Sequence, residues 1–483
     1  MLKQLPRLNA DETFDTYRRF WAVPDAQRAV QALFEEAYRS FDEKVLVLDD
    51  DPTGIQTVHD VDVVTDWRKE TLQRFFESDE RLCFVLTNSR SFSSERTCEA
   101  HREIALNAAG AEKASGQRFV LVSRGDSTLR GHYPLETEVL RTALEERGAA
   151  FDGEWFCPFF REGGRFTLDG VHYVREGDEL VPAAQTEFAR DKTFGYAHSD
   201  LPGYLEEKSG GRIAASDVLV VTLRELRSLQ LDQLVQRIAS ADGFRYIVSD
   251  ALEESDLMVM ATVLLRLMAQ GRRYLIRSAA AVPKVLGHIS DRTLLSRDEL
   301  SSGDASLGGL VIVGSHVKKT TEQLSRLRQS AARLEWIEFR TGAWQESGGL
   351  KSETRRCAAL AEEAIRRGST AVVYTSRTLV APEGASAEEL LSISVRISDA
   401  LTAVVSSLHI RPRFLIAKGG ITSSDVGVKA LRVSRARVMG QAQPGVPVWK
   451  TGGESLFPGL CYIIFPGNVG TADTLRAIVD TLS

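Results

Sequence analysis

Ten short runs of β-branched and aromatic residues recur along the chain, and their spacing constrains the fold more than any other feature. Long amphipathic stretches with helical periodicity, such as 95–115 and 320–334, separate most of these runs. Strands that alternate with helices in this way form parallel sheets covered by helices. We therefore predict a doubly wound α/β chain. The expected strands are 44–49, 82–87, 118–123, 217–223, 244–249, 273–277, 309–314, 370–375, 413–417 and 460–465.

A length of 483 residues is enough for two such domains, each with a mainly parallel sheet flanked by helices. The best boundary is the stretch 301–309, whose small and polar residues suit a linker. We expect a helical N-terminal extension over 1–40, a first domain over 41–300 and a second over 301–483. The region 151–212 is rich in Phe, Gly and Arg without clear periodicity, and it is expected to form loops or a small insertion.

Composition excludes several classes of protein. Hydrophobic residues make up 43% of the chain, but no apolar run approaches the roughly 20 residues that span a bilayer. A formal net charge of −6 argues against a nucleic-acid partner, which would need a concentrated basic surface. The first residues carry no signal-peptide pattern, so we expect a cytoplasmic protein. The five cysteines are odd in number and far apart, which fits neither a disulfide framework nor a zinc site.

Polar residues follow the expected strands, and ligands bind beyond the carboxyl ends of strands in a doubly wound sheet. The most informative of these positions are Asp50 and Asp51, which leave the first strand together with Asp49. Neighbouring carboxylates repel one another unless they act on a cation, a cationic side chain or a reacting hydroxyl. A solvated acidic turn is the alternative interpretation.

Three arginines at the next strand ends favour a site over a solvated turn. Arg90 follows the second strand, and Arg124 and Arg130 flank the third. Their guanidinium groups match carboxylates or phosphates bidentately and indicate an acidic substrate. Together with Asp50, Asp51 and Asp126, which can accept hydroxyl protons, they predict a site for a polyhydroxy acid. Each arginine taken singly fits a surface or domain-stabilising role better than a role in a site.

The second half contains two glycine turns after strands. Residues 418–425 pass through Gly419 and Gly420 into hydroxyl residues that can cap a helix beginning near Asp425. Free N–H groups at such a helix start bind anions, and an ordinary capped turn is the alternative. A second glycine turn at Gly467 follows the last expected strand and would let the protein backbone approach a nucleotide closely. Neither a P-loop nor a Gly-x-Gly-x-x-Gly fingerprint is present, and no motif assigns a metal ligand.

Several strings in both halves resemble the four-carbon acid sugar kinases, the group of threonate, erythronate and 3-oxo-tetronate kinases. The resemblance spans residues 43 to 475. In the first half it rests on Asp50-Asp51-Pro52-Thr53-Gly54, Asn88-Ser89-Arg90 and Asp126-Ser127-Thr128-Leu129-Arg130-Gly131. In the second half it rests on Gly314-Ser315, Gly419-Gly420-Ile421-Thr422-Ser423, Pro444-Gly445-Val446-Pro447 and Gly467-Asn468-Val469-Gly470.

The resemblance implies an ATP-dependent kinase that phosphorylates a hydroxyl of a small sugar acid in the cleft between its domains, with Mg²⁺ on the phosphates. The catalytic candidates are Asp50, Asp51 and Asp126, and the candidates for substrate binding are Arg90, Arg124, Ser127 and Arg130. The candidates for nucleotide binding are Ser315, Gly419, Gly420, Ile421, Thr422 and Gly467. Two positions depart from the family pattern: Ser123-Arg124-Gly125 replaces an expected lysine, and His132 replaces a common asparagine.

Two other functions fit the same residues. One is a non-catalytic sensor that keeps both pockets, although a sensor has no need of a base. The other is a nucleotide-independent lyase or isomerase on sugar acids, which leaves the second domain unexplained. The sequence leaves open the exact sugar acid, the hydroxyl that is phosphorylated, which aspartate is the base, and whether the chain is a homo-oligomer.

Overall fold

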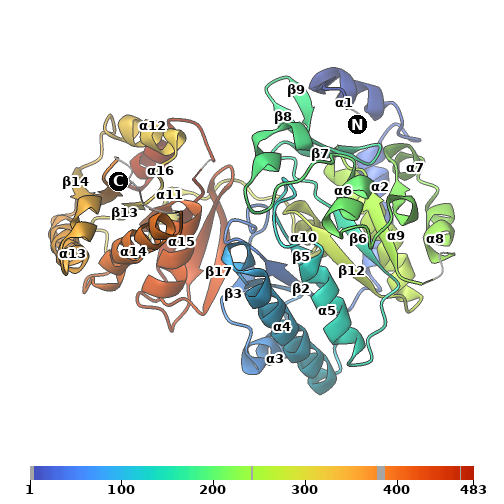
Figure 1. Ribbon diagram of the computed structural model, residues 1–483, viewed down its shortest axis with the longest axis horizontal. Coiled ribbons are helices and arrows are strands. Elements are labelled where there is room, and N and C mark those ends of the chain that lie inside the picture. Colours follow the sequence, from blue (N-terminus) through green and yellow to red (C-terminus); the bar gives the residue numbers. More distant parts are fainter. Residues whose placement is uncertain (1–4, 241–242, 378–386, 468) are drawn as a thin grey trace. The chain divides into compact units, whose positions relative to one another are not determined.

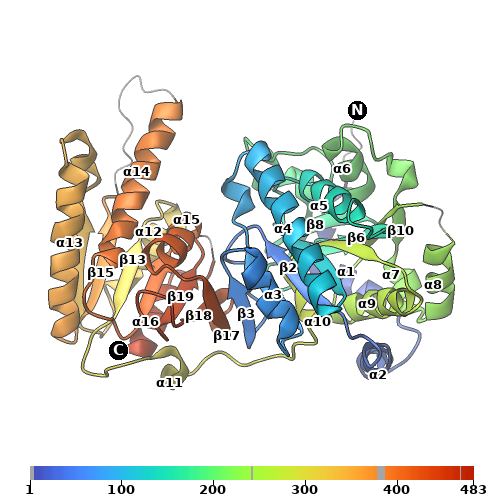
Figure 2. The same cartoon turned by 90° about the horizontal axis from the view of Figure 1, so that it is seen from below.

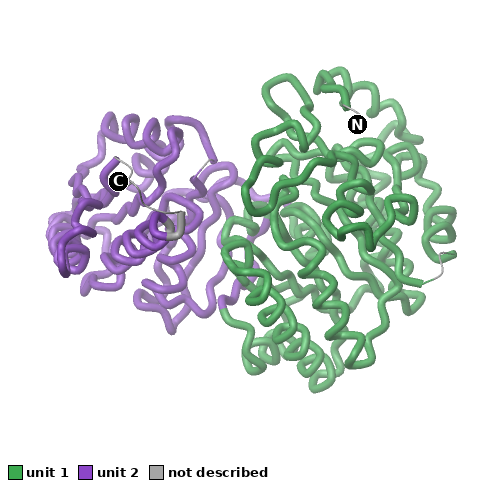
Figure 3. The backbone as a smooth tube through the Cα atoms, in the orientation of Figure 1, with its two compact units in different colours: residues 1–57, 66–290 green, residues 58–65, 291–483 purple. Residues whose placement is uncertain are grey.

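A computed structural model of the chain describes residues 5–240, 243–377, 387–467 and 469–483. Its contacts divide the chain into two compact units. The first is formed by residues 1–57 and 66–290, and the second by residues 58–65 and 291–483 (Figure 3). A short segment of the N-terminal half therefore belongs to the second unit.

The main sheet of the first unit has the strand order β10-β11-β6-β12-β5-β2-β4, and every neighbouring pair is parallel. All residues of β2, β4 and β5 are buried, as expected for parallel strands covered on both faces. The strands are β2 (Lys44–Asp49), β4 (Leu82–Leu86), β5 (Phe119–Arg124), β6 (Gly153–Cys157), β10 (Leu219–Val221), β11 (Arg245–Ser249) and β12 (Tyr274–Ser278).

The helices of this unit gather in two groups, one on each face of the sheet (Figures 1 and 2). The first group is α3 (Lys69–Glu77), α4 (Ser94–Ser115) and α5 (Leu135–Glu145). The second is α2 (Ala26–Tyr38), α7 (Leu223–Arg227), α8 (Leu231–Ala239), α9 (Glu254–Ala269) and α10 (Ala281–Leu286).

A small antiparallel sheet completes the first unit, with the order β1-β9-β8-β7. Its strands are β1 (Leu8–Asn9), β7 (Arg165–Leu168), β8 (Val171–Glu176) and β9 (Glu179–Pro182). The helices next to it are α1 (Ala10–Arg18) and α6 (Leu201–Lys208), and the short 3₁₀ helices of the unit are η1 (Ser89–Ser91), η2 (Ala183–Gln185), η3 (Glu187–Arg190) and η4 (Ala215–Asp217).

The second unit has a mixed sheet in the order β3-β17-β18-β19-β16-β13-β15-β14. The five strands from β19 to β14 are parallel, and the pairs β3–β17, β17–β18 and β18–β19 are antiparallel. The strands are β3 (Val61–Val64), β13 (Leu310–Val313), β14 (Leu334–Phe339), β15 (Thr370–Thr375), β16 (Leu415–Lys418), β17 (Arg435–Gln443), β18 (Val446–Thr451) and β19 (Cys461–Phe465).

The helices of the second unit also form two groups. One contains α13 (Gly349–Arg366), α14 (Ala387–Ser406), α15 (Gly420–Asp425) and the π-helix η6 (Val426–Ala430), with η5 (Thr341–Gln345) beside them. The other contains α11 (Arg297–Leu300), α12 (Lys318–Leu327) and α16 (Thr474–Leu482). No helix of the described part of the chain is long and apolar enough to cross a membrane.

The predicted doubly wound α/β class is confirmed, and each of the ten expected strands overlaps an observed one. The prediction for residues 151–212 was wrong in part, because β6 is a strand inside the main sheet. Its run is interrupted by Glu154, which is 1% exposed and accepts a hydrogen bond of 2.8 Å from Tyr133 Oη. A buried carboxyl whose partner lies 21 residues away in the sequence interrupts the apolar pattern, so the pattern did not reveal this strand.

Three helix predictions also need correction. The helical extension predicted over 1–40 contains two helices, α1 and α2, and Phe20 and Trp21 lie beyond the end of α1. The helix expected over 320–334 is α12, which ends at Leu327 before β14. The helix expected near Asp425 begins at Gly420, directly after β16, so the hydroxyl residues lie inside the helix and do not cap it.

Candidate functional site

The carboxylates after β2 are neutralised by two arginines. Arg90, in the 3₁₀ turn η1, donates to both oxygens of Asp50, with Nη2 at 2.6 Å and Nε at 3.0 Å, and its Nη1 lies 3.4 Å from Asp51. Arg124, the last residue of β5, donates to Asp49 at 3.0 Å and to Asp50 at 3.3 Å. The side chain of Asp50 is 2% exposed, whereas that of Asp51 is 21% exposed. Asp51 is therefore the more accessible carboxylate.

The three neighbouring carboxyls have different proton affinities. Burial raises the pKa of Asp49 to about 7, although Arg124 opposes the shift, and burial also raises the pKa of Asp50. Burial acts in the same direction on Asp51, but Arg90 and two hydrogen bonds from Thr53 outweigh it and lower its pKa. Asp51 is thus the member of the trio that stays charged most easily.

A second carboxylate cluster follows β5. Asp126 accepts hydrogen bonds from the Thr128 hydroxyl and from Arg130 Nε, the latter at 2.7 Å. Burial raises the pKa of Asp126, but Arg90, Arg130 and these hydrogen bonds lower it far more. Ser127 is buried, and its carbonyl oxygen lies 2.8 Å from a ring nitrogen of His172. The structure thus brings the predicted residues of the first half into two adjoining clusters.

Arg277, on β12, is a part of this site that the sequence did not identify. It donates to Glu136 at 2.6 Å and to the Ser123 hydroxyl at 2.8 Å. A Cβ at Gly125 would overlap its guanidinium group, and a Cβ at Gly131 would lie 3.3 Å from it. The backbone of the Asp126 loop therefore rests against this arginine. No sequence signal indicates this, because Arg277 lies inside a strand and its partners are far away along the chain.

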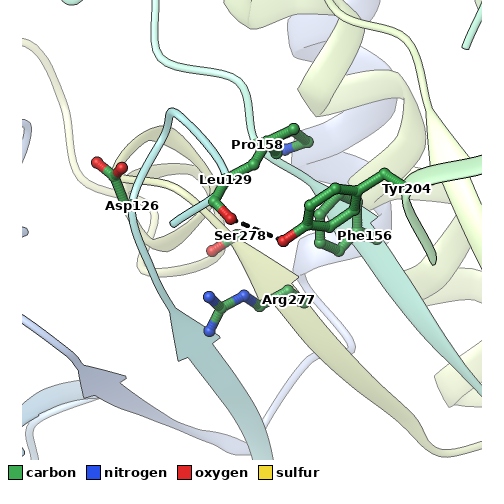
Figure 4. Close-up of a pocket in the computed structure, with 7 residues that line it drawn as sticks. All are labelled: Asp126, Leu129, Phe156, Pro158, Tyr204, Arg277 and Ser278. Atoms are coloured by element: carbon green, nitrogen blue, oxygen red, sulfur yellow. Dashed lines mark hydrogen bonds between the residues drawn. The ribbon is translucent and has the colours of Figure 1, made fainter. Parts of the chain in front are cut away.

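Figure 4 shows Arg277 and Asp126 lining one small cavity with Tyr204, whose hydroxyl donates to the carbonyl oxygen of Leu129 at 2.7 Å. The cavity volume is about 10 Å³, which is at the lower limit for a single water molecule. This cavity is too small for a sugar acid. Its polar walls instead fix the conformation of the loop that carries Asp126.

In the second unit, the carboxyl ends of three neighbouring strands come together as a backbone cradle. Gly419 has a φ of +124°, and a Cβ there would lie 3.2 Å from Ser315 Cβ and from Thr422 Oγ1. A Cβ at Gly467 would lie 3.4 Å from Ser315 Oγ. Four of the six predicted nucleotide-binding residues therefore meet at the ends of β13, β16 and β19. The positive φ and the tight contacts favour glycine at position 419, whereas a Cβ at Gly467 would make an ordinary contact.

The remaining two predicted residues occupy the start of α15. Gly420 is its first residue, and Ile421 follows with a side chain that is 70% exposed. An apolar side chain this exposed at the rim of the cradle can pack against a flat apolar ligand group. Residue Asn468, part of the second glycine turn, lies outside the described residues.

Two cations at the cradle were absent from the predicted site. The side chain of Lys418, at the end of β16, is fully buried, and burial lowers its pKa to about 7. Arg377, after β15, donates to the carbonyl oxygen of Ser315 and to the Thr321 hydroxyl, each at 2.7 Å. Lys418 is the last residue of β16 and Arg377 lies two residues after β15, so the rule about strand ends contained the signal that could have found them.

The described side chains add no metal ligand to the site, and His132 has a structural environment. Within the described ranges, no group of three or more His, Cys, Asp or Glu side chains could hold a metal ion. A ring nitrogen of His132 lies 3.0 Å from the Phe92 carbonyl oxygen, and its ring packs against Phe194, as expected for a packing residue.

Comparison with known proteins divides the chain in the same two parts. A family model described as a sugar-binding N-terminal domain matches residues 45–286, and one described as a nucleotide-binding C-terminal domain matches residues 310–475. No curated protein matches the chain significantly.

Two solved structures resemble the chain over nearly its whole length. Haemophilus influenzae protein HI1011, assigned to DUF1537, has a TM-score of 0.61 at 18% identity, covering 91% of this chain and 100% of its own. A Salmonella typhimurium LT2 protein, provisionally assigned as a tRNA synthase, has a TM-score of 0.62 at 17% identity, covering 90% and 99%. At such identities the likeness establishes the fold alone.

Proposed function

Because the chain belongs to the family that joins a sugar-binding N-terminal domain to a nucleotide-binding C-terminal domain, we propose that it is an ATP-dependent sugar-acid kinase. Its substrate would be a four-carbon acid sugar such as threonate, erythronate or 3-oxo-tetronate, or a close relative. One observation supports the proposal most: the same chain has a cluster of arginines and aspartates in its first unit and a glycine cradle in its second. Such an enzyme would serve carbohydrate catabolism in the cytoplasm.

Phosphoryl transfer requires alignment of the acceptor hydroxyl and neutralisation of phosphate charge, and little covalent help from the protein. The hydroxyl oxygen attacks the γ-phosphorus of ATP, its proton passes to a carboxylate, and ADP leaves. Asp51 fits the role of base, because its carboxylate is charged and accessible. Asp50 has both oxygens held by Arg90, so it fits a positioning role. Asp126 is the competing candidate.

The three arginines named for the substrate, Arg90, Arg124 and Arg130, each hold an internal carboxylate. An arginine has five N–H donors, and these contacts leave some of them unused. We propose that the unused donors contact hydroxyl oxygens of the sugar acid, while the ion pairs keep the aspartates in place. Ser127 would support the same loop.

We place the phosphate chain at the cradle of Ser315, Gly419, Thr422 and Gly467, because backbone N–H groups of glycine turns after strands bind phosphate oxygens. The φ of +124° and the tight contacts of a Cβ at Gly419 support this placement. Gly420 and Ile421 would complete the nucleotide site. Mg²⁺ would be carried by the ATP phosphates, the usual arrangement at nucleotide sites.

A coupled assay of ADP release across sugar acids of four to six carbons tests the proposal. ADP formation that depends on one of these acids is expected. Calorimetry with ATP and Mg²⁺ then separates the alternatives: a sugar-only lyase or isomerase would give no binding heat, and a sensor would bind both ligands without forming ADP.

A further inference from the structure

Arg165, the first residue of β7, differs from the other arginines around Asp126. Arg130 pairs with Asp126, and Arg277 pairs with Glu136. Arg165 forms no ion pair with any described residue, and its buried Nε has no hydrogen-bond partner. Arg165 is thus a half-buried guanidinium whose Nε the fold leaves without a partner.

The surrounding residues place this guanidinium beside the Asp126 cluster. Its central carbon lies 5.5 Å from the centre of the Phe188 ring, and that of Arg130 lies 5.2 Å from the same ring. Gly163 leaves room for the side chain, because a Cβ there would lie 3.1 Å from Arg165 Nη1. Arg165 and Arg130 thus share one aromatic contact.

Keeping such a cation costs stability. Burial lowers the pKa of Arg165, and the nearby charge of Arg130 acts in the same direction, while Asp126 opposes both. A half-buried charge without an ion-pair partner, one of whose donors is fully buried, gains stability when a ligand supplies an anion.

We propose that Arg165 binds the carboxylate of the sugar acid and so makes the site selective for acids over neutral polyols. This inference rests on the proposed function. A carboxylate matches the two parallel N–H groups of a guanidinium, and Phe188 limits the orientations that the guanidinium can adopt. The hydroxyl end of the same molecule would then lie toward the aspartates.

Calorimetry on the Arg165→Gln variant tests the proposal. The affinities to measure are those for the acids erythronate and threonate and for the neutral polyols erythritol and threitol. We expect the affinity for the preferred acid to fall by about 25-fold or more, as for loss of one partner of a desolvated charge pair. The ratio of acid to polyol affinity should approach one, and the affinity for ATP should not change. Arg165→Lys keeps the charge but lacks the paired N–H groups of a guanidinium, so its acid affinity should lie between those of the unmodified protein and Arg165→Gln.

Thermal unfolding separates this role from a structural one. Removing a half-buried charge that has no ion-pair partner should leave the unfolding temperature of Arg165→Gln unchanged or raise it. The matched control is Arg161→Gln, an exposed arginine in the same hairpin, which should retain full acid affinity.

Unchanged preference for acids in Arg165→Gln would overturn the assignment of Arg165 and leave the kinase proposal intact. If Arg165→Gln lost both thermal stability and ATP affinity, Arg165 would have a structural role, and this result would overturn the inference as well. Failure of the unmodified protein to bind any of the acids would contradict the proposed function itself, and the inference with it.

Discussion

The ammonium group of Lys418 lies 2.6 Å from the carbonyl oxygen of Pro466 and also 3.2 Å from that of Gly467. The same nitrogen lies 3.9 Å from the centre of the Phe465 ring. A fully buried lysine thus ties the end of β16 to the turn after β19, where the glycine cradle is formed. This contact holds the two glycine turns together.

Binding of ATP is expected to take up a proton through Lys418. Burial lowers the pKa of this lysine to about 7, and a nearby phosphate favours the charged form and raises the pKa. Between pH 7 and 8 the lysine is therefore partly neutral before binding and charged afterwards. Calorimetric ATP titrations at pH 8 in Tris and in HEPES should differ in heat for the unmodified protein. They should differ less for Lys418→Met, and equal buffer dependence in both proteins would contradict the prediction.

Buried carboxyls should make the free protein more stable in mild acid. Burial raises the pKa of Glu154 to about 7, above the value of about 4.3 in an unfolded chain. The folded state therefore holds the proton more tightly, and the stability that this provides is present below pH 4 and is lost as the pH rises through 7.

Urea unfolding at pH 5 and pH 7.5 measures this dependence. Glu154→Gln, which imitates the protonated acid beside Tyr133, should reduce the loss of stability between the two pH values. A variant whose loss equals that of the unmodified protein would contradict a raised pKa of Glu154 as the source of this pH dependence.

Asp51→Asn should lower kcat by about 10²-fold or more, the usual contribution of a general base. Asp50→Asn should lower kcat as well, because Arg90 would lose its charged partner. The two variants differ in stability: Asp50→Asn should unfold more easily, since it leaves a buried guanidinium poorly compensated. If both retain nearly full kcat on the true substrate, Asp126 becomes the leading candidate and Asp126→Asn is the next variant to measure.

Gly419→Ala should weaken ATP binding selectively. A φ of +124° is unfavourable for alanine, and the new Cβ would press on Ser315 and Thr422. Sugar-acid affinity, which depends on the first unit, should not change. Gly453→Ala is the control, since a Cβ there meets no atom within 4 Å. Equal losses for both ligands in Gly419→Ala would point to misfolding instead of a phosphate cradle.

Patterns local to the sequence predicted much of the fold and several parts of the site. Apolar runs revealed the buried parallel strands, and the rule about strand ends drew attention to Asp51, Arg90 and Gly419. The rule works because successive parallel strands expose their carboxyl ends at the same edge of a sheet. The same reasoning could have included Lys418.

Features that depend on distant partners could not be predicted in this way. Strand β6 escaped because Glu154 is stabilised inside the core by Tyr133, which lies far away in sequence. Strand β3 pairs with β17, more than 370 residues further along, through Asp62 and Arg435 among others. The unpaired state of Arg165 is likewise a property of the folded packing and not of any motif.

Phosphorus NMR of the unmodified protein with ATP, Mg²⁺ and each four-carbon sugar acid tests the central claim most directly. A new phosphomonoester signal should grow as the γ-phosphate signal of ATP declines, and only when a sugar acid is present. Conversion of ATP to inorganic phosphate alone, or an unchanged ATP spectrum with every acid, would contradict a sugar-acid kinase.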